Sequence, residues 1–309
     1  MSKSAAPPNS KWQKEVFPGQ SVRDVAVRCL KSRLQAVEFW LPLAAEQSSA
    51  DVENVHQLRV STRRAAEALR LFAGLLAKPT LKLLRQQLRE LRQAAGDARN
   101  LDVLGAQFLK AALESSREDP SWKVAELVMQ QREAAQQPII ALHKRLIDER
   151  IGDTIRSAVE SIGRSPKNKA ERFGEHAQQY FKPILKTFLK SAEADLSEEE
   201  AFHDVRIRAK KLRYSMEIVA AAFPVVFRKK LYQRITSLQN VMGMVNDHAT
   251  AKTLFGNWMG KESDPQLKAF FQGIVLAEEK AHEDIRDVFF ATWTSAEFER
   301  LRKQFNKCC

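Results

Sequence analysis

One fifteen-residue pattern occurs twice in this sequence of 309 residues. His56 to Arg70 has the sequence HQLRVSTRRAAEALR, and His203 to Glu217 has the sequence HDVRIRAKKLRYSME. Counted from its histidine, each stretch has basic residues at offsets three, seven and eight, and the two histidines are 147 residues apart. A chain that repeats such a pattern in one register is expected to fold into two similar halves.

Both stretches have the periodicity of an amphipathic helix, with one cationic side and one apolar side. The cationic side of the first stretch comprises His56, Arg59, Arg63, Arg64, Glu67 and Arg70. Its apolar side comprises Leu58, Thr62, Ala65, Leu69 and Phe72. The second stretch divides in the same way, with Val205, Ala209, Leu212, Met216 and Val219 on its apolar side. Each stretch is therefore predicted to be a helix with one face in a core and one cationic face that carries a histidine.

A second pair of segments keeps the same spacing. Gly96 in LRQAAGDARNLD and Gly243 in LQNVMGMVNDHA are also 147 residues apart, which indicates an internal duplication. No segment alternates with the period of a strand, so we expect an all-α fold of two four-helix-type bundles related by pseudo-twofold symmetry. The predicted organisation is a flexible N-terminal tail over 1–20, a first half over 21–163, a polar linker over 164–170 and a second half over 171–307.

A third helix is predicted to open at Pro79 and to end at Gly96. Its apolar stripe is Leu81, Leu84, Leu88, Leu91 and Ala95, and its basic stripe is Lys82, Arg85, Arg89 and Arg92. Because the basic stripe borders the seam with the neighbouring helix, it is expected to line a groove. A further helix is expected from about Leu101, and two more segments are expected on either side of Pro138.

The charge of the chain favours a polyanionic partner. There are 50 Lys and Arg residues against 38 Asp and Glu residues, so the net charge is +12 at pH 7. Nucleic acid, an inorganic polymer or an anionic membrane would each suit this surplus. No apolar run reaches the roughly 18 residues of a membrane span, and the N-terminus lacks the hydrophobic segment of a secretory signal. With only three cysteines, Cys29, Cys308 and Cys309, a disulfide scaffold is excluded, and we expect a cytoplasmic protein.

The repeated motifs resemble those of a known family. H-x-x-R-x-x-x-R-R from His56, H-x-x-R-x-x-x-K-K-L-R-Y from His203 and GDARNLD from Gly96 are similar to motifs of the CHAD domains, the conserved histidine α-helical domains. Asn100 stands where that family usually has Asp. The segment LQNVMGMVND from Leu238 is similar to the matching part of the family's second half. Four motifs in the same order, over about residues 20 to 300, make the resemblance specific.

The resemblance implies a pair of four-helix bundles whose basic surface binds inorganic polyphosphate, in a groove or channel lined by the two duplicated helices. CHAD domains are often fused to a CYTH triphosphatase, but the E-x-E-x-K motif of that enzyme class is absent from this sequence. We therefore expect a stand-alone CHAD protein that binds polyphosphate without catalysis, without a cofactor and without a metal ion, and that is recruited to polyphosphate granules. The expected ligands of polyphosphate are His56, Arg59, Arg63, Arg64, Arg70, Lys82, Arg85, Arg89, Arg99, His203, Arg206, Lys210, Lys211, Arg213 and Tyr214.

Several of these residues have alternative roles. The two histidines are either neutral structural donors or phosphate ligands that become protonated on binding, which is the favoured interpretation; metal ligation is disfavoured by the crowded arginines. Tyr214 either donates its hydroxyl to phosphate or packs at the edge of the core. Glu67 and Glu217 are expected to orient arginines, and Asp102 is expected to cap a helix end. The other four histidines are expected to be surface or interface residues.

Two other functions compete with polyphosphate binding. The net charge would also serve a nucleic-acid-binding protein, or weak nucleic-acid binding beside polyphosphate. The aromatic residues, however, have the spacing of core residues rather than of a stacking platform. A phosphotransferase or phosphatase would need carboxylates that hold Mg²⁺, and the cationic faces carry few acids. The pattern predicts no particular oligomeric state.

Overall fold

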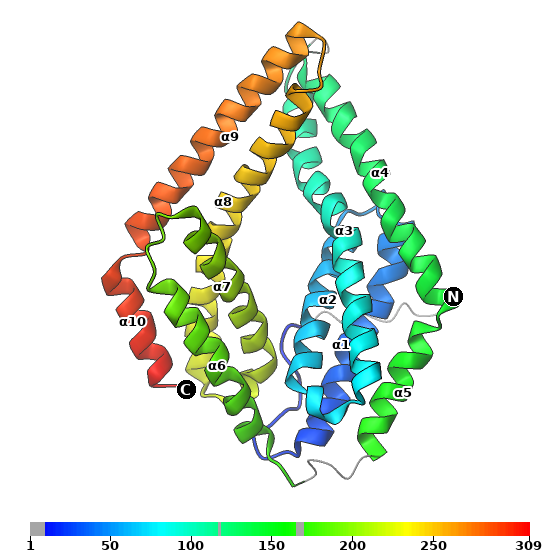
Figure 1. Cartoon of the computed structure of the whole chain (residues 1–309), viewed down its shortest axis with the longest axis vertical. Coiled ribbons are helices and arrows are strands. Elements are labelled where there is room, and N and C mark those ends of the chain that lie inside the picture. The colour runs from blue at the N-terminus through cyan, green and yellow to red at the C-terminus, as the bar shows by residue number, and fades with distance from the viewer. Residues whose placement is uncertain (1–9, 117–118, 165–169) are drawn as a thin grey trace. The chain divides into compact units, whose positions relative to one another are not determined.

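The chain is all-α in the computed structural model (Figure 1), which describes residues 10–116, 119–164 and 170–309. Within those ranges no β-strand is formed, so the fold class predicted from the sequence is confirmed. The chain folds into two compact units, Met1–Ala177 and Gln178–Cys309. None of the described helices is long and apolar enough to cross a membrane.

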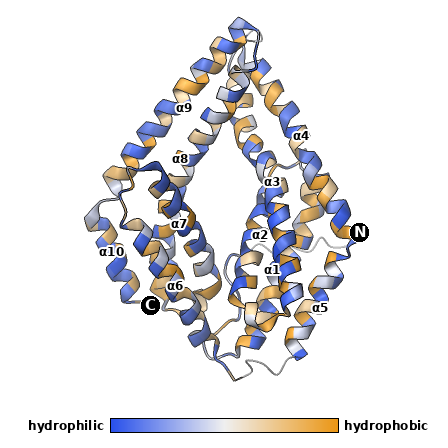
Figure 2. Ribbon diagram, viewed as in Figure 1, coloured by the Kyte–Doolittle hydropathy of each residue, from blue (hydrophilic) through white to orange (hydrophobic). Residues whose placement is uncertain are grey.

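The first unit is a bundle of long helices. Its helices are α1 (Val22–Glu46), α2 (Glu53–Leu71), α3 (Lys78–Leu113), α4 (Ser121–Asp148) and α5 (Ile151–Arg164), with a 3₁₀ turn η1 (Ala73–Leu75) between α2 and α3. α1 packs against α2, α4 and α5, and α3 packs against α2 and α4. Hydrophobic and hydrophilic residues intermingle along each helix (Figure 2), as expected for helices that bury one side.

The second unit contains most of α6 (Phe173–Ala192) and the helices that follow it. These are α7 (Glu199–Val219), α8 (Tyr232–Met259), α9 (Pro265–Thr292) and α10 (Ser295–Asn306), with a 3₁₀ turn η2 (Ala220–Ala222) and a π-helical turn η3 (Phe227–Leu231) before α8. An aromatic cluster fills the core where α6, η3 and α10 meet. Phe181 and Phe227 have ring centroids 5.2 Å apart, and Phe223 stacks on Phe227 at 4.4 Å. Phe305 of α10 completes the cluster.

Three of the predicted helix boundaries are wrong. Gly96 does not end a helix, because α3 continues through it to Leu113, and no new helix starts at Leu101. Pro138 likewise lies inside α4 instead of separating two segments. Glycine and proline cost about 1 and 3 kcal/mol inside a helix, and extensive packing of α3 against α4 outweighs these costs.

The interior of the first unit contains an ion pair that the sequence analysis missed. Asp102, expected to cap a helix end, lies in the middle of α3 and is buried. Its Oδ1 accepts from Nε of Arg132 on α4 at 2.5 Å. Burial raises the pKa of the Asp102 carboxyl, while Arg132 opposes that rise. Because α3 runs on past Gly96, Asp102 has no free helix end to cap and pairs across the bundle.

The start of α6 belongs to the first unit. His176 Nε2 lies 2.9 Å from the carbonyl oxygen of Leu71, and its ring stacks on Phe72. The backbone N–H of Phe173 donates to Gln20 at 2.9 Å. These contacts explain why the two units divide after Ala177, beyond the predicted linker at 164–170. Residues 165–169 of that linker lie outside the described residues, and the predicted domain boundaries stay predictions.

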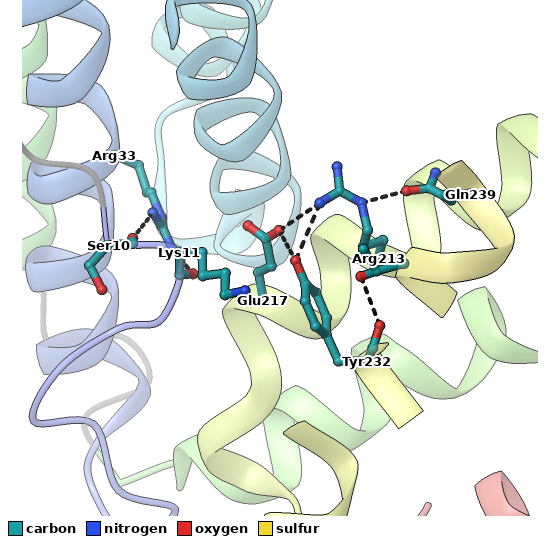
Figure 3. A network of polar contacts seen from close by, with 8 residues as sticks. Ser10, Lys11, Arg33, Arg213, Glu217, Tyr232 and Gln239 are labelled. Atoms are coloured by element: carbon teal, nitrogen blue, oxygen red, sulfur yellow. Dashed lines mark hydrogen bonds and ion pairs between the residues drawn. The ribbon is translucent and has the colours of Figure 1, made fainter. Parts of the chain in front are cut away.

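The described part of the predicted tail is held against α1. Arg33 is buried, and its Nη1 and Nη2 donate to the carbonyl oxygens of Ser10 and Lys11, both at 2.7 Å (Figure 3). Residues 1–9 of the predicted tail lie outside the described residues. The contacts of Arg33 mean that residues 10 and 11 are part of the first unit's fold.

The spacing of 147 residues also relates elements of the two units. η1 and η2 differ by this number at both ends, and α2 and α7 agree with it to within one residue. Gly96 and Gly243 occupy interior positions of α3 and α8. The internal duplication and its symmetry stay predictions, but elements at this spacing have the same type and order.

Candidate functional site

The cationic side of α2 lies beside α3. Nη1 of Arg59 donates to the carbonyl oxygen of Arg92 at 2.9 Å. A Cβ atom placed on Gly96 would lie 3.6 Å from the same nitrogen. The guanidinium of Arg59 therefore packs onto α3 at the glycine, and this contact joins the histidine motif to the glycine motif.

His56 is half-buried in a positively charged environment. Burial lowers the pKa of its imidazole, and the charges of Arg99, Arg63 and Arg59 lower it further, whereas Glu53 opposes them. The neutral imidazole is therefore favoured in the absence of an anion. Arg99, from the GDARNLD motif of α3, acts on the same histidine as the arginines of α2.

A groove runs beside α3 where this helix follows α2. Its volume is about 540 Å³. It is lined by Ala66, Arg70, Lys78, Leu81, Lys82, Arg85, Gln86, Arg89 and Arg92. Six of these described lining residues are Lys or Arg and none is acidic, so we call it the basic groove. At about 1.5 Å per residue, the row on α3 from Lys78 to Arg92 is roughly 21 Å long.

The cations of the basic groove crowd one another. Burial lowers the pKa of the Arg92 guanidinium, and the charges of Arg70, Arg63 and Arg89 lower it further. Arg70 is held in place by Glu67, which is 1% exposed and accepts from Nη1 of Arg70 at 2.6 Å. An anion in the basic groove would relieve the repulsion among these charges.

The structure gathers part of the expected set in this groove. Arg70, Lys82, Arg85 and Arg89 line it, together with Arg92 of the same stripe. Lys78 also lines it and was missed, although its position one turn before Lys82 is the signal that would have found it. The expected ligands of the first unit that lie outside the lining are His56, Arg59, Arg63, Arg64 and Arg99. Since Arg63 lowers the pKa of both His56 and Arg92, it connects the histidine electrostatically to the basic groove.

The corresponding face of α7 is arranged differently. His203 and Lys211 are exposed, Lys210 is half-buried and Arg206 is buried. Nη2 of Arg206 lies 3.5 Å from Nδ1 of His203. His203 is in the second turn of α7, which begins at Glu199. Arg206 thus supports the histidine from within its own helix.

Arg213 lies in a network of internal contacts between α7 and α8 (Figure 3). Its Nη1 donates to Glu217 at 3.2 Å and lies 3.3 Å from the hydroxyl of Tyr232, and its Nε donates to Gln239. The Tyr232 hydroxyl donates to the same oxygen of Glu217 at 2.7 Å. The guanidinium carbon stands 4.4 Å from the ring centroid of Tyr214, which is 7% exposed. We call these five residues the arginine network.

The network compensates its own charge. Burial, together with Glu217, raises the pKa of Tyr232 to about 12, so the hydroxyl keeps its proton and donates it to the carboxylate. Glu217 is 2% exposed, and its charge faces Arg213. The expectation that Glu67 and Glu217 orient arginines is confirmed in both units. For Tyr214, burial under Arg213 favours the packing role over donation to phosphate.

The family model of the CHAD domain matches residues 28–256. The chain belongs to the CHAD domain family. This CHAD domain is similar to the crystal structure of the CHAD domain from the plant Ricinus communis, with 20% identity and a TM-score of 0.67 over 89% of this chain and 93% of that chain. It is also similar to PptA from Streptomyces chartreusis, with 16% identity and a TM-score of 0.59 over 87% of this chain and 98% of that chain. No curated protein matches the sequence. These structural likenesses support the fold of the CHAD domain.

Three of the remaining histidines are close to carboxylates, and the first is His176, whose Nδ1 lies 2.8 Å from Glu171. His143 is buried and lies 3.5 Å from Glu46, so its expected surface or interface position is corrected to the core. Nδ1 of His248 lies 2.6 Å from Glu278, which links α8 to α9. Within the described ranges, no group of three or more His, Cys, Asp and Glu residues is placed to hold a metal ion.

Proposed function

We propose that this CHAD domain binds inorganic polyphosphate in the basic groove without hydrolysing it. The observation that supports this most directly is the row of Lys and Arg side chains along α3, faced by Arg70 from α2. Polyphosphate is a linear polymer with about one negative charge per phosphate and no bases. A row of cations roughly 21 Å long matches such a polymer in shape and in charge.

The chemistry of the lining favours phosphate over a nucleobase. Four of the six cations are arginines, whose planar forks can each donate two hydrogen bonds to phosphate oxygens. Single-stranded nucleic acid is usually bound with the help of aromatic side chains on which the bases stack. The described lining of the groove contains no aromatic residue.

The absence of catalysis is part of the proposal. Hydrolysis of a phosphoanhydride would need a positioned water and usually a Mg²⁺ ion held by carboxylates. Among the described residues that line the groove there is no carboxylate, and Glu67, which holds Arg70, is buried. Binding without turnover would recruit the protein to polyphosphate granules, in the cytoplasm where such granules form.

The test is a calorimetric titration with long-chain polyphosphate at 50 and 200 mM salt. We expect submicromolar affinity at the lower concentration and, for about six phosphate contacts, a loss of affinity on the order of a thousandfold at the higher one. Long polyphosphate should displace duplex DNA far better than DNA displaces polyphosphate. No binding, or binding that salt does not weaken, would refute the proposal.

A pair of variants assigns the binding to the groove. Arg85→Gln/Arg89→Gln removes two cations from the lining, and Lys31→Gln/Lys144→Gln removes two exposed cations of the same unit outside it. We expect a large loss of affinity only for the first variant. Release of orthophosphate from polyphosphate in the presence of Mg²⁺ or Mn²⁺ would overturn the non-catalytic part of the proposal.

A further inference from the structure

The basic groove has a counterpart in the sequence of the second unit. At the spacing of 147 residues that relates η1 to η2, five of the six groove cations are replaced by residues without a positive charge. Arg70 corresponds to Glu217, Lys78 to Val225, Arg85 to Tyr232, Arg89 to Thr236 and Arg92 to Gln239. Only Lys82 keeps its charge, as Lys229.

One uncharged residue of the groove lining is replaced by a cation in the second unit. Ala66, a small residue in the lining of the groove, corresponds to Arg213. The side chain of Arg213 contacts Glu217, Tyr232 and Gln239, three of the five replacement residues. Four of the five residues of the arginine network therefore stand at positions that correspond to lining residues of the basic groove.

The two arrangements have opposite electrostatic character. In the groove, the pKa of Arg92 is lowered by burial and by neighbouring cations, so the site is short of negative charge. In the network, the carboxylate of Glu217 accepts from Arg213 and from Tyr232, so the one cation already has its anion. An incoming phosphate would have to displace a carboxylate that is 2% exposed.

We propose that the two halves of this CHAD domain are not equivalent: the basic groove takes the phosphate chain, and the arginine network is a closed version of the same site. This inference rests on the proposed function and goes beyond it. Arg213 and Tyr214 then hold α7 against α8 and do not contact the polymer. In the second unit, the polymer is left with the exposed cations of the surface, such as Lys211 and Lys229.

Matched removal of one arginine from each arrangement tests the inference. Arg85→Gln removes a guanidinium from the groove, and Arg213→Gln removes one from the network. The measured quantity is the slope of log K against log salt concentration for long-chain polyphosphate, which falls by roughly 0.7 to 0.9 for each lost phosphate contact. We expect a slope reduced by about one contact for Arg85→Gln and an unchanged slope for Arg213→Gln.

A second variant guards against misfolding. Arg213→Gln alone leaves Glu217 buried without its cation, whereas Arg213→Gln/Glu217→Gln keeps the net charge and leaves neutral groups that can still form hydrogen bonds with Tyr232 and Gln239. Its fold is checked by circular dichroism and by its melting temperature. With the fold intact, we expect wild-type affinity and a wild-type slope.

The outcomes separate the two proposals. If Arg213→Gln/Glu217→Gln lowers the slope as much as Arg85→Gln does, Arg213 contacts the polymer and the inequivalence of the halves is refuted while polyphosphate binding stands. The inference is equally refuted if Arg85→Gln leaves the slope unchanged. If the wild-type protein does not bind polyphosphate, the proposed function fails, and the inference fails with it.

Discussion

His56 is a residue whose charge depends on what lies beside it. Burial and the charges of Arg99, Arg63 and Arg59 hold its pKa below the ordinary value of about 6.5. A phosphate chain near these residues would add negative charge and raise that pKa. At pH values between the pKa of the free state and the pKa of the bound state, the imidazole would then take up a proton when the polymer binds.

The first prediction is that polyphosphate binds more tightly as the pH falls from 8. Because protonation favours the bound state, affinity rises as the pH falls through the bound-state pKa. The gain levels off only below the free-state pKa, which lies under about 6.5. A pKa difference of one unit between the two states gives at most about tenfold tighter binding. The measurement is a titration between pH 8 and 5.5 at constant ionic strength.

The same pH series on His56→Gln provides the control. This variant cannot take up the proton, so its affinity should change less with pH than that of the wild type. A wild-type affinity that is flat over the whole range would show that His56 is a neutral structural residue.

Single residues also show what the sequence could and could not predict about the site. Lys82, Arg85 and Arg89 recur at helical spacing beside an apolar stripe, and this local pattern was enough to place them in a groove. Arg213 has the same local signal, but its partners Tyr232 and Gln239 lie on another helix. Pairing across helices depends on packing, which the periodicity of one helix does not contain.

At the scale of helices, hydrophobic periodicity predicts where a helix runs better than the positions of glycine and proline do. The apolar stripe of α3 predicted the helix and its buried face, and Leu84, Leu88 and Leu91 are buried. The predictions that Gly96 ends a helix and that Pro138 separates two segments are wrong, because the intrinsic cost of one residue is small beside the burial of a long helix. A glycine inside one of these helices therefore still lowers the stability of the protein relative to alanine.

The second prediction follows from that cost. A Cβ atom on Gly243, inside α8, would have no heavy atom within 4 Å. Gly243→Ala should therefore stabilise the protein by about 0.5–1 kcal/mol, since alanine is the better helix former. Urea unfolding of the two proteins measures the difference. Gly96→Ala, whose Cβ would touch Arg59 at an ordinary 3.6 Å, should behave similarly, and a loss of stability at Gly243 would contradict the account.

The third prediction concerns the pairing of α3 with α4. Arg132→Leu leaves the buried carboxylate of Asp102 without its cation, which should cost about 3–5 kcal/mol at pH 7. Burial already raises the pKa of Asp102, and loss of Arg132 removes the opposing charge, so its pKa rises further. The folded state then binds more protons than the unfolded state, and stability falls as the pH rises. Urea unfolding should show a smaller loss at pH 5 than at pH 8.

A double variant separates charge from packing in the same pair. Asp102→Asn/Arg132→Gln replaces the ion pair by neutral groups that can still form a hydrogen bond, and it should recover most of the lost stability. If Arg132→Leu proves as stable as the wild type at pH 8, the carboxylate of Asp102 is not held as a buried anion.

At the scale of the whole molecule, net charge and local charge have different consequences. The net charge of +12 predicts a polyanionic partner but does not show where on the molecule the partner binds. The structure concentrates six cations in one groove of the first unit. The positions that correspond to these six cations in the second unit keep one positive charge, Lys229, and the nearby Arg213 is compensated by Glu217. A ligand that binds the groove should therefore stabilise the two compact units to different extents.

The last prediction is that polyphosphate slows hydrogen exchange mainly in the first unit. A ligand that binds only the folded state stabilises it by RT ln(1 + [L]/Kd), about 2.7 kcal/mol at a hundredfold excess over Kd, which slows exchange through unfolding about a hundredfold. The slowest amides of a unit exchange through such opening. We expect this slowing in α2 and α3 and a much smaller effect in α7 and α8.

Exchange measured by mass spectrometry with and without long-chain polyphosphate tests this prediction. Arg85→Gln/Arg89→Gln is the control variant that should lose the protection. Equal protection of both units, retained in Arg213→Gln/Glu217→Gln, would show that the polymer engages the two halves alike through cations outside the arginine network.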